Sequence, residues 1–474
     1  MEEWKAKLKE LCGIDIRSLA CFRMALALIL LGDLFYRVQD LKAHYSDAGV
    51  LPRDLLNLLE GNWSLSLHRL SGSWQVELLL FILAALFAVA LLVGYKTRLA
   101  TLFSWFLLVS LHARNPIVLQ GGDALLRILL FWGIFLPLGA CFSVDQRLRP
   151  KQLENRVVTA ATLALLLQVC FVYWFSAFLK SDDSWRSDGT AIWYALSIEQ
   201  FTTSFGLLLL KFPTLLKVLT FTAFYLELLG PFFAFSPFWT APLRFATAVT
   251  FMLFHLVGMN LTMELALFTY VCAAAWIVFI PGWFWERVLK LKWYSPKAIP
   301  WRASWLSNGL AVFFILYIFL WNVRTLDVSL PFFPSQANSI GILLGINQEW
   351  NMFSPHPLKE DGWYVIPAKL RNGKEVDLFK EGQPVSWQKP PLVSAIYTND
   401  RWRSYMMNLL LDEAGEALAP PYAGYLCREW NSSHSFGEQL MQFDINFMLK
   451  INQLGKPNRI RKLTLLRFHC QPPT

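Results

Sequence analysis

The run VELLLFILAALFAVALLVG at residues 76–94 contains a single charged residue, Glu77. An α-helix needs about 20 consecutive, mostly apolar residues to cross the hydrocarbon core of a membrane, so this run predicts a transmembrane helix. The same length test selects further runs at residues 19–37, 98–112, 123–142, 158–179, 213–235, 241–260, 263–281 and 306–323. The sequence therefore predicts a membrane-embedded all-α bundle of about nine transmembrane helices.

The composition agrees with a membrane protein and excludes some other classes. Hydrophobic residues make up 55% of the 474 positions and charged residues 16%, whereas an ordinary soluble domain has about 25% charged residues. The net charge of +9 is spread over loops, and no run of five or more Lys and Arg residues occurs, so nucleic-acid binding is not indicated. The seven cysteines form neither a CxxC pair nor a Cys/His cluster, so no metal is predicted.

The composition changes after residue 324, where prolines interrupt the chain and polar residues become frequent. We therefore expect a polytopic transmembrane domain at residues 1–324 and a soluble, β-rich domain at residues 325–474. Asn372-Gly373 lies between strand-like runs at 363–366 and 375–379, and Asn-Gly is the strongest short-range signal for a β-hairpin. A final strand is expected at 463–468 and helices near 402–411 and 436–451, which together predict an antiparallel α+β domain.

Lys and Arg residues are unevenly distributed between the two sides of the predicted bundle. The side that holds the N-terminus and the loops at 144–156 and 281–302 has roughly twice as many as the other side, and cytoplasmic loops carry such an excess. We expect a cytoplasmic N-terminus and a C-terminal domain in a periplasm or lumen. Cys427 and Cys470 belong to that domain, and on an oxidising side they are predicted to form a disulfide.

Charged side chains inside the predicted helices mark candidate sites, because each costs about 3 kcal/mol at the membrane centre unless it is paired or hydrated. The candidates for a shared substrate or lipid pocket are Arg23, Asp33, Asp123, Arg127, Glu227 and His255. The alternative for each is a structural ion pair or hydrogen bond that holds the bundle together. Asp123 and Arg127, for example, are four residues apart and can pair along one helix face.

Lys180 ends an apolar run and is followed by Asp182, Asp183 and Trp185. A lysine in this position can extend its amine to the membrane interface. Alternatively, an amine held in an apolar pocket loses proton affinity and becomes a usable base near neutral pH. The two interpretations differ in whether the Lys180 amine is buried. The sequence does not show this, so both remain open.

Several segments resemble the horizontally transferred transmembrane (HTTM) domain family, which is related to the vitamin K-dependent gamma-carboxylases. They are Tyr36-Arg37, YSDAGVLPR at 45–53, Arg114-Asn115-Pro116, Gly121-Gly122-Asp123, Phe254-His255, WNMFSP at 350–355 and Arg401-Trp402-Arg403. The stretch SAFLKSDDSW at 176–185 is similar to the carboxylase segment in which a lysine, followed five residues later by a tryptophan, deprotonates the reduced vitamin K hydroquinone.

The resemblance implies that Lys180 is a catalytic base acting on a lipid-soluble hydroquinone, with Arg114, Asn115 and Trp185 in the pocket. It further implies a lyase that forms a carbon–carbon bond and uses a reduced, vitamin K-like quinone without a metal. Pro116 stands where the carboxylases have a histidine, and the soluble domain of about 150 residues is smaller than the lumenal part of the eukaryotic enzyme. Both departures weaken the transfer of glutamate carboxylation but leave a shared quinone or lipid pocket.

Two functions follow from this interpretation. The first is a carboxylase-like membrane enzyme whose external domain binds a protein substrate or partner. The second is a non-catalytic quinone- or lipid-binding membrane protein whose external domain recruits a partner protein, and it tolerates Lys180→Ala. Membrane lipids are partners in both cases. Secondary transport ranks last, since matching halves with broken helices are not evident in the sequence.

Overall fold

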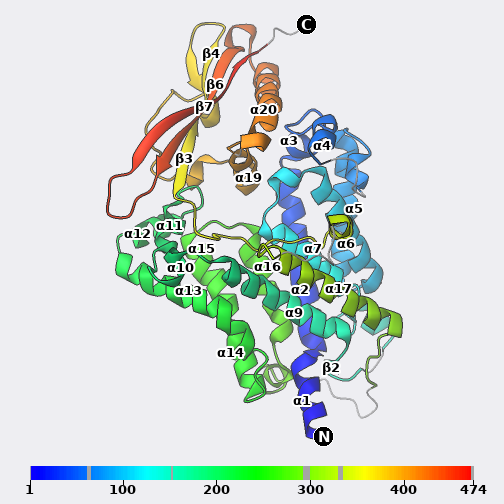
Figure 1. Ribbon diagram of the computed structural model, residues 1–474. Coiled ribbons are helices and arrows are strands. Elements are labelled where there is room, and N and C mark those ends of the chain that lie inside the picture. Colours follow the sequence, from blue (N-terminus) through cyan, green and yellow to red (C-terminus); the bar gives the residue numbers. More distant parts are fainter. Residues whose placement is uncertain are drawn as a thin grey trace.

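The computed structural model describes residues 2–60, 66–150, 153–291, 299–328, 335–410 and 412–470. A large helical unit contains the N-terminus at its far end, and a smaller domain with a β-sheet lies at the opposite end with the C-terminus (Figure 1). The two units meet through the short helices that follow the long apolar ones.

Six helices of the described chain are long and apolar enough to cross a membrane. They are α2 (Ile16–Val38), α5 (Trp74–Val93), α9 (Ala160–Leu179), α13 (Pro213–Phe233), the continuous segment Thr240–Thr262, and α17 (Trp305–Arg324). The continuous segment consists of α14 (Thr240–Leu253), the π-helical turn η3 (Phe254–Met259) and α15 (Asn260–Thr262). The chain is therefore a multi-pass membrane protein.

The prediction of nine spans is not confirmed, because three of the expected runs form helices that fail the length or hydropathy test. They are α6 (Thr97–Arg114), α7 (Gly121–Gly133) and α16 (Leu267–Trp276), the last continued by the short η4 (Ile277–Phe279). Helix α6 carries polar and charged residues along its last turns, and α7 stops before Pro137, which lacks the N–H that a continuing helix requires. Most residues of α7 and α16 are buried in the bundle.

Short helices and turns connect the long ones. In the helical unit these are α1 (Glu2–Cys12), α3 (Leu41–Tyr45), α4 (Arg53–Glu60), η1 (Leu67–Arg69), η2 (Pro116–Val118), α8 (Val144–Leu148), α10 (Asp183–Arg186), α11 (Ala191–Ser197), α12 (Ser204–Leu209), η5 (Phe284–Val288), η6 (Ser335–Ala337) and α18 (Asn338–Leu343). A two-stranded pairing of β1 (Ile14–Asp15) and β2 (Arg156–Val157) joins the start of α2 to the segment before α9.

The C-terminal domain is an antiparallel sheet with two helices. Its elements are β3 (Glu360–Val365), β4 (Pro367–Leu370), β5 (Glu375–Asp377), η7 (Leu378–Lys380), η8 (Ser394–Ile396), α19 (Asp400–Asn408), α20 (Asp412–Ser433), η9 (Phe436–Glu438), β6 (Leu440–Ile451) and β7 (Arg459–His469). Strand β6 is central, with β3 and β4 along one edge and β7 along the other. The expected hairpin turn at Asn372-Gly373 joins β4 to β5, and Gly373 has a φ of 86°.

The prediction of a helix at 436–451 is wrong, because most of this segment is strand β6. Its apolar residues match a buried strand as well as a helix, and pairing with three strands decides between them. The sequence also hides α20, since Pro420 and Pro421 lie inside it and proline normally interrupts a helix. Cys470 follows β7 and forms a disulfide with Cys427 of α20, with their Cα atoms 5.8 Å apart.

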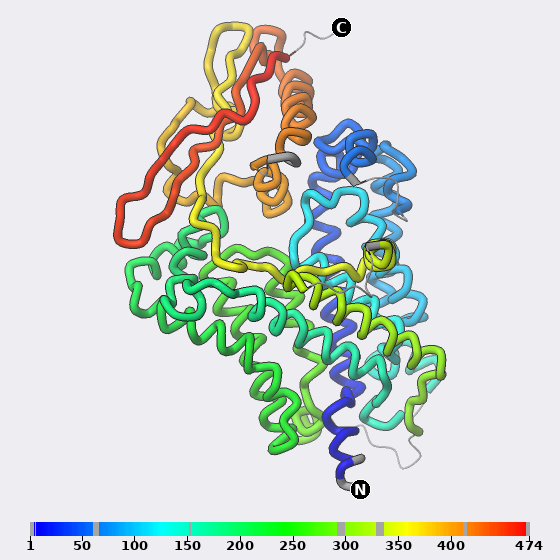
Figure 2. The backbone as a smooth tube through the Cα atoms, in the orientation of Figure 1, coloured from blue at the N-terminus to red at the C-terminus, as the bar shows by residue number. Residues whose placement is uncertain are grey.

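The sheet begins well after the boundary that we expected at residue 325. Helix α17 ends at Arg324, and the chain from 335 to 359 crosses the helical unit before it turns into β3 (Figure 2). Ile346 and Trp350 are buried in the core of the helical unit. Conversely, Val50, Leu51 and Val118, from the loops after α2 and α6, are buried in the core of the C-terminal domain. Each unit thus contributes buried residues to the core of the other.

Candidate functional site

Lys180, the residue predicted as a catalytic base, lies at the C-terminal end of α9 and is buried, with 3% of its surface exposed. Its amine forms an ion pair with the carboxylate of Glu227 on α13 and donates a hydrogen bond to Ser176 Oγ at 2.9 Å. The amine also lies 4.8 Å from the centre of the Trp185 ring. Because Glu227 is buried as well, extension of the lysine to the interface is excluded in this structure.

Helix geometry brings the polar groups of this site onto one face. Tyr173, Ser176 and Lys180 are separated by three and four residues on α9, which places them one above another. Thr159 caps the N-terminus of α9 through its hydroxyl, and Asp182 caps the short α10 that carries Trp185. The Trp185 indole donates to the Phe353 carbonyl at 3.0 Å. The segment before β3 therefore covers this side of the site.

His255 contacts the same face of α9 at Tyr173, farther from the C-terminal end of the helix than Lys180. Its Nε2 lies 3.4 Å from the Tyr173 hydroxyl, which also accepts a hydrogen bond of 2.8 Å from Trp276 Nε1. His255 belongs to the π-helical turn η3, and such turns interrupt the regular backbone hydrogen bonding and are frequent at functional sites. Lys180, Glu227, Trp185 and His255 are thus the predicted site residues that the structure gathers around α9.

Asp33 and Asp123, also predicted as pocket residues, form a second buried cluster with two arginines. Arg37 donates to Asp33 at 2.7 Å and to Asp123 at 2.5 Å. Arg401, from α19 of the C-terminal domain, donates to the same two carboxylates at 2.7 Å and 2.5 Å. Burial alone would lower the pKa of Arg401, but the carboxylates of Asp123 and Asp33 outweigh it and raise that pKa above its ordinary value. This cluster links α2, α7 and α19.

One group in the described chain has metal-ligand chemistry, and it belongs to this second cluster. Ligand atoms of Asp33, His112 and Asp123 lie within 4.8 Å of one another. The carboxylate oxygens already accept hydrogen bonds from the guanidinium groups of Arg37 and Arg401, which supply the positive charge that a cation would supply. We therefore assign these oxygens to arginine binding.

Comparison with protein families decides the identity of the helical unit. A family model described as the HTTM domain matches residues 12–283. The chain belongs to the HTTM domain family. No curated protein and no solved structure matches the chain. The matched range contains Lys180, Glu227, His255 and both aspartates of the second cluster, whereas Arg401 lies outside it in the C-terminal domain.

The other predicted residues of the HTTM domain lie apart from Lys180. Arg23 donates to the carbonyls of Leu138 and Phe142 at 3.0 and 2.6 Å. Arg114 donates to the Leu51 carbonyl at 2.9 Å, and Asn115 to the His44 carbonyl at 2.8 Å. These three side chains fix loops at the two ends of the bundle through backbone oxygens, which for Arg23 matches the structural alternative.

Arg127 does not pair with Asp123, although the spacing of the two residues on α7 permits it. Asp123 bonds to Arg37 and Arg401 instead, and it also accepts from the backbone N–H of Gln120 at 2.7 Å. The Nε of Arg127 donates to the Gly345 carbonyl at 2.7 Å. The charged partners of Asp123 and the partners of Arg127 lie at distant positions in the sequence, so helix periodicity could not identify them.

A third buried charge cluster was missed by the sequence reasoning. Glu199, between α11 and α12, accepts from Lys450 of β6 at 2.5 Å and from Lys389 at 2.8 Å. Lys450 also lies 3.4 Å from Asp361 of β3. Burial raises the pKa of Glu199, but the hydrogen bonds from both lysines outweigh it, so the pKa is lowered. The sequence gives no local signal for this cluster, because its members lie on four distant segments.

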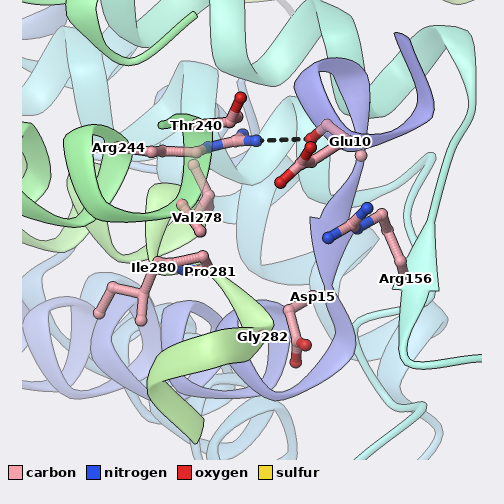
Figure 3. Close-up of a pocket in the computed structure, with 11 residues that line it drawn as sticks. Glu10, Asp15, Arg156, Thr240, Arg244, Val278, Ile280, Pro281 and Gly282 are labelled. Carbon is pink, nitrogen blue, oxygen red and sulfur yellow. Dashed lines mark hydrogen bonds between the residues drawn. The ribbon is translucent and has the colours of Figure 1, made fainter. Parts of the chain in front are cut away.

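A small cavity of about 20 Å³ lies near the N-terminus, between α1, the start of α14 and the segment around Pro281 (Figure 3). Arg244 is buried beside it and donates to the Glu10 carbonyl at 3.0 Å. The Nε and Nη2 of Arg244 have no hydrogen-bond partner among the described residues. This volume has room for about one water molecule, so the cavity suits a bound water and is too small for a substrate.

Proposed function

We propose that this HTTM protein binds a lipid-soluble hydroquinone next to Lys180 and uses Lys180 as the base that removes a hydroxyl proton from it. The observation that carries the proposal is the buried Lys180–Glu227 pair at the end of α9. A buried amine is costly unless a partner compensates it, and ionisable residues inside a membrane bundle are functional candidates by default.

The pair gives Lys180 a way to become a base. Transfer of the amine proton to the Glu227 carboxylate would leave a neutral amine, whose lone pair can accept a proton from a hydroxyl group. Ser176 Oγ lies 3.3 Å from Glu227 Oε2 and 2.9 Å from Lys180 Nζ, so it holds both groups in place. Trp185 adds an aromatic surface beside the amine. The resemblance of residues 176–185 to the carboxylase segment supports the same assignment.

The chemistry that we propose ends at deprotonation of the hydroquinone. In the carboxylases a histidine follows the asparagine of the loop between the third and fourth helices, and here Pro116 takes that place. Asn115 and Pro116 begin the turn η2, in which Asn115 accepts from the backbone N–H of Ile117 at 3.2 Å. This loop therefore has a structural role, and a carboxylase-type carbon–carbon bond formation would need a different residue.

A second candidate function rests on the same pair. Lys180 and Glu227 satisfy each other's charge and join α9 to α13, as a structural ion pair in a membrane bundle would do. In that case the protein binds a quinone or another lipid without converting it, and the external domain recruits a partner protein. The two candidates differ in whether Lys180 is required for a reaction of bound hydroquinone.

Reconstitution in nanodiscs with reduced menaquinone as the probe separates them. The bound quinone is extracted and quantified by mass spectrometry, and aerobic oxidation of the hydroquinone is followed by absorbance. We expect the wild-type protein to accelerate oxidation by about 10²–10⁴-fold, the usual contribution of a general base. Lys180→Met should abolish this acceleration while the quinone remains bound, and Glu227→Gln should reduce it.

Lys42→Met is the matched control, because Lys42 is an exposed lysine whose partner Glu429 is exposed as well. It should leave both binding and oxidation unchanged. Equal oxidation rates for the wild-type and Lys180→Met proteins, with quinone bound to both, would establish the non-catalytic candidate instead. Recovery of phospholipid alone from the wild-type protein would contradict both candidates.

We also propose that the N-terminus is cytoplasmic and that the C-terminal domain lies in a periplasm or lumen, where it binds a partner or substrate protein. Two observations support this orientation. Lys and Arg residues are enriched in loops on the side of the N-terminus, and the Cys427–Cys470 disulfide belongs to the chemistry of an oxidising compartment.

A further inference from the structure

A second, larger cavity lies between the N-terminus of α7, the C-terminus of α17 and the chain around residues 338–349. Its volume is about 670 Å³, which is within the range of about 300–1,000 Å³ that small-molecule sites occupy. The lining residues that matter here are Gly121, Arg127, Trp321, Arg324, Asp327 and Glu349. Because α17 is a candidate membrane span that ends at Arg324, we expect the cavity at the boundary between membrane and water.

Arg127 is the buried charge of this cavity, with 8% of its surface exposed. Its Nε donates to the Gly345 carbonyl at 2.7 Å, and its Nη2 donates to the main-chain and side-chain oxygens of Asn347 at 2.9 Å each. Its Nη1 has no acceptor among the residues that the structure describes. Nη1 is not among the buried polar atoms that lack a partner, so solvent reaches it, and a ligand in the cavity can accept a hydrogen bond from it.

Two further groups favour a negatively charged ligand atom at this end. Gly121 is the first residue of α7, which has 13 residues, and the first N–H groups of a helix attract anions. Arg324 is exposed at the other wall, and one of its nitrogens bonds to Asn338 Oδ1. The guanidinium groups of Arg127 and Arg324 and the helix terminus match the several oxygens of a phosphate.

The cavity also has two acidic residues, Asp327 and Glu349, both exposed. They equal the two arginines in number, so the charges of the lining residues cancel. A purely anionic ligand would be repelled by these carboxylates, whereas a zwitterion with a phosphate and an ammonium group complements both signs. Trp321, whose indole donates to the Gln348 carbonyl at 2.8 Å, adds an aromatic side chain of the kind that lies at headgroup level.

We propose that this cavity binds the headgroup of phosphatidylethanolamine. The phosphate oxygens accept hydrogen bonds from Arg127 Nη1 and Arg324, and the ammonium group donates to Glu349 and Asp327. The acyl chains extend along α17 into the bilayer. This site is separate from Lys180 and does not depend on the proposed reaction.

The test compares lipids that differ only in the headgroup. Delipidated full-length protein is incubated with dioleoyl phosphatidylethanolamine, phosphatidylcholine or phosphatidylglycerol, and bound lipid is counted by native mass spectrometry. We expect phosphatidylethanolamine to be retained at least tenfold better than the other two, because only its headgroup offers both a phosphate and N–H donors. Arg324→Gln and Glu349→Gln should each lower its retention about tenfold.

Arg467→Gln is the matched control, since Arg467 is an exposed arginine of β7, far along the chain from this cavity, and should retain the lipid as the wild type does. Equal retention of the three lipids, or unchanged retention in both cavity variants, would overturn the proposal. Displacement of the lipid by soluble glycerophosphoethanolamine at equal concentration would overturn the lipid assignment in favour of a free phosphate ester. Arg127 is not substituted, because it also holds the loop at Gly345.

Discussion

Several buried acidic side chains in this protein pair with basic groups from distant parts of the chain. Arg401 is the clearest case, because it is the contribution of the C-terminal domain to a cluster whose other members belong to the HTTM domain. With Arg37 it balances the charges of Asp33 and Asp123. Removing one partner of such a cluster leaves an uncompensated charge out of water, which costs more than the cluster itself contributes.

Arg401→Leu should therefore destabilise the protein by about 3–5 kcal/mol. Asp33 and Asp123 would then share one guanidinium, and α19 would lose its bonds to α2 and α7. The expected readout is a lower melting temperature in detergent, together with faster hydrogen exchange of the backbone amides at residues 399–408. The double variant Asp33→Asn/Arg401→Leu should recover part of the loss, because it removes the excess negative charge.

Arg467→Ala is a suitable control for this prediction. Its ion pair with Asp444 has an arginine side chain that is 72% exposed, and exposed pairs contribute about 0–1 kcal/mol. If Arg401→Leu changed stability no more than this control, the cluster would not join the two units.

Contacts between helices depend on small residues as well as on charges. At the start of α7, a Cβ atom on Gly122 would lie 2.7 Å from the backbone nitrogen of Phe268 on α16. At the preceding residue, Gly121, the nearest atom to such a Cβ would be 3.5 Å away, which is ordinary contact. Close helix packing through small residues is typical of membrane bundles, so Gly122 fixes the separation of α7 and α16.

Gly122→Ala should destabilise the protein by about 1–3 kcal/mol, the usual range for overpacking a dense interior. The added methyl group meets main-chain atoms, which cannot rotate away. Gly121→Ala provides a neighbouring control and should leave stability within about 1 kcal/mol of the wild type. Equal melting temperatures for the two alanine variants would show that α16 can shift without cost.

Hydrogen bonds and ion pairs join the two units. Arg401 binds the cluster on α2 and α7, and Arg403 donates to the Glu264 carbonyl at 2.6 Å. Glu199 binds two lysines of the C-terminal domain. Together with the residues that each unit contributes to the core of the other, these contacts hold the C-terminal domain over the end of the bundle that contains Lys180. Its location relative to the membrane therefore also decides which compartment the site faces.

The proposed orientation predicts the labelling of Cys427 and Cys470 in intact cells. A membrane-impermeant maleimide should label neither cysteine before reduction, since both are in the disulfide. After reduction with an impermeant phosphine, the accessible thiols should become labelled without disruption of the inner membrane. Cys427→Ser/Cys470→Ser serves as the blank. Labelling that requires permeabilised cells would place the domain in the cytoplasm and refute the orientation.

The amino-acid sequence by itself indicated the membrane character and a β-containing domain, and its nine predicted spans include the six long apolar helices that the structure contains. These properties follow from local runs and local turns: about 20 apolar residues suffice for a span, and Asn372-Gly373 suffices for the hairpin. The sequence also singled out Lys180, through its position between an apolar run and two carboxylates. Such signals lie within a few residues of one another, so no tertiary contact is needed to read them.

Only the tertiary structure decided which charged residues pair with one another and which segments pair as strands. Glu227 is 47 residues from Lys180, and Arg401 is 278 residues from Asp123, so periodicity along one helix pointed to Asp123–Arg127 instead. Strand β6 is a strand because β3, β4 and β7 pair with it, although its apolar pattern also fits a helix. The pairing of a buried charge and the secondary structure of a short apolar segment depend on the residues that pack around them. Tertiary packing, rather than proximity in the sequence, brings those residues together.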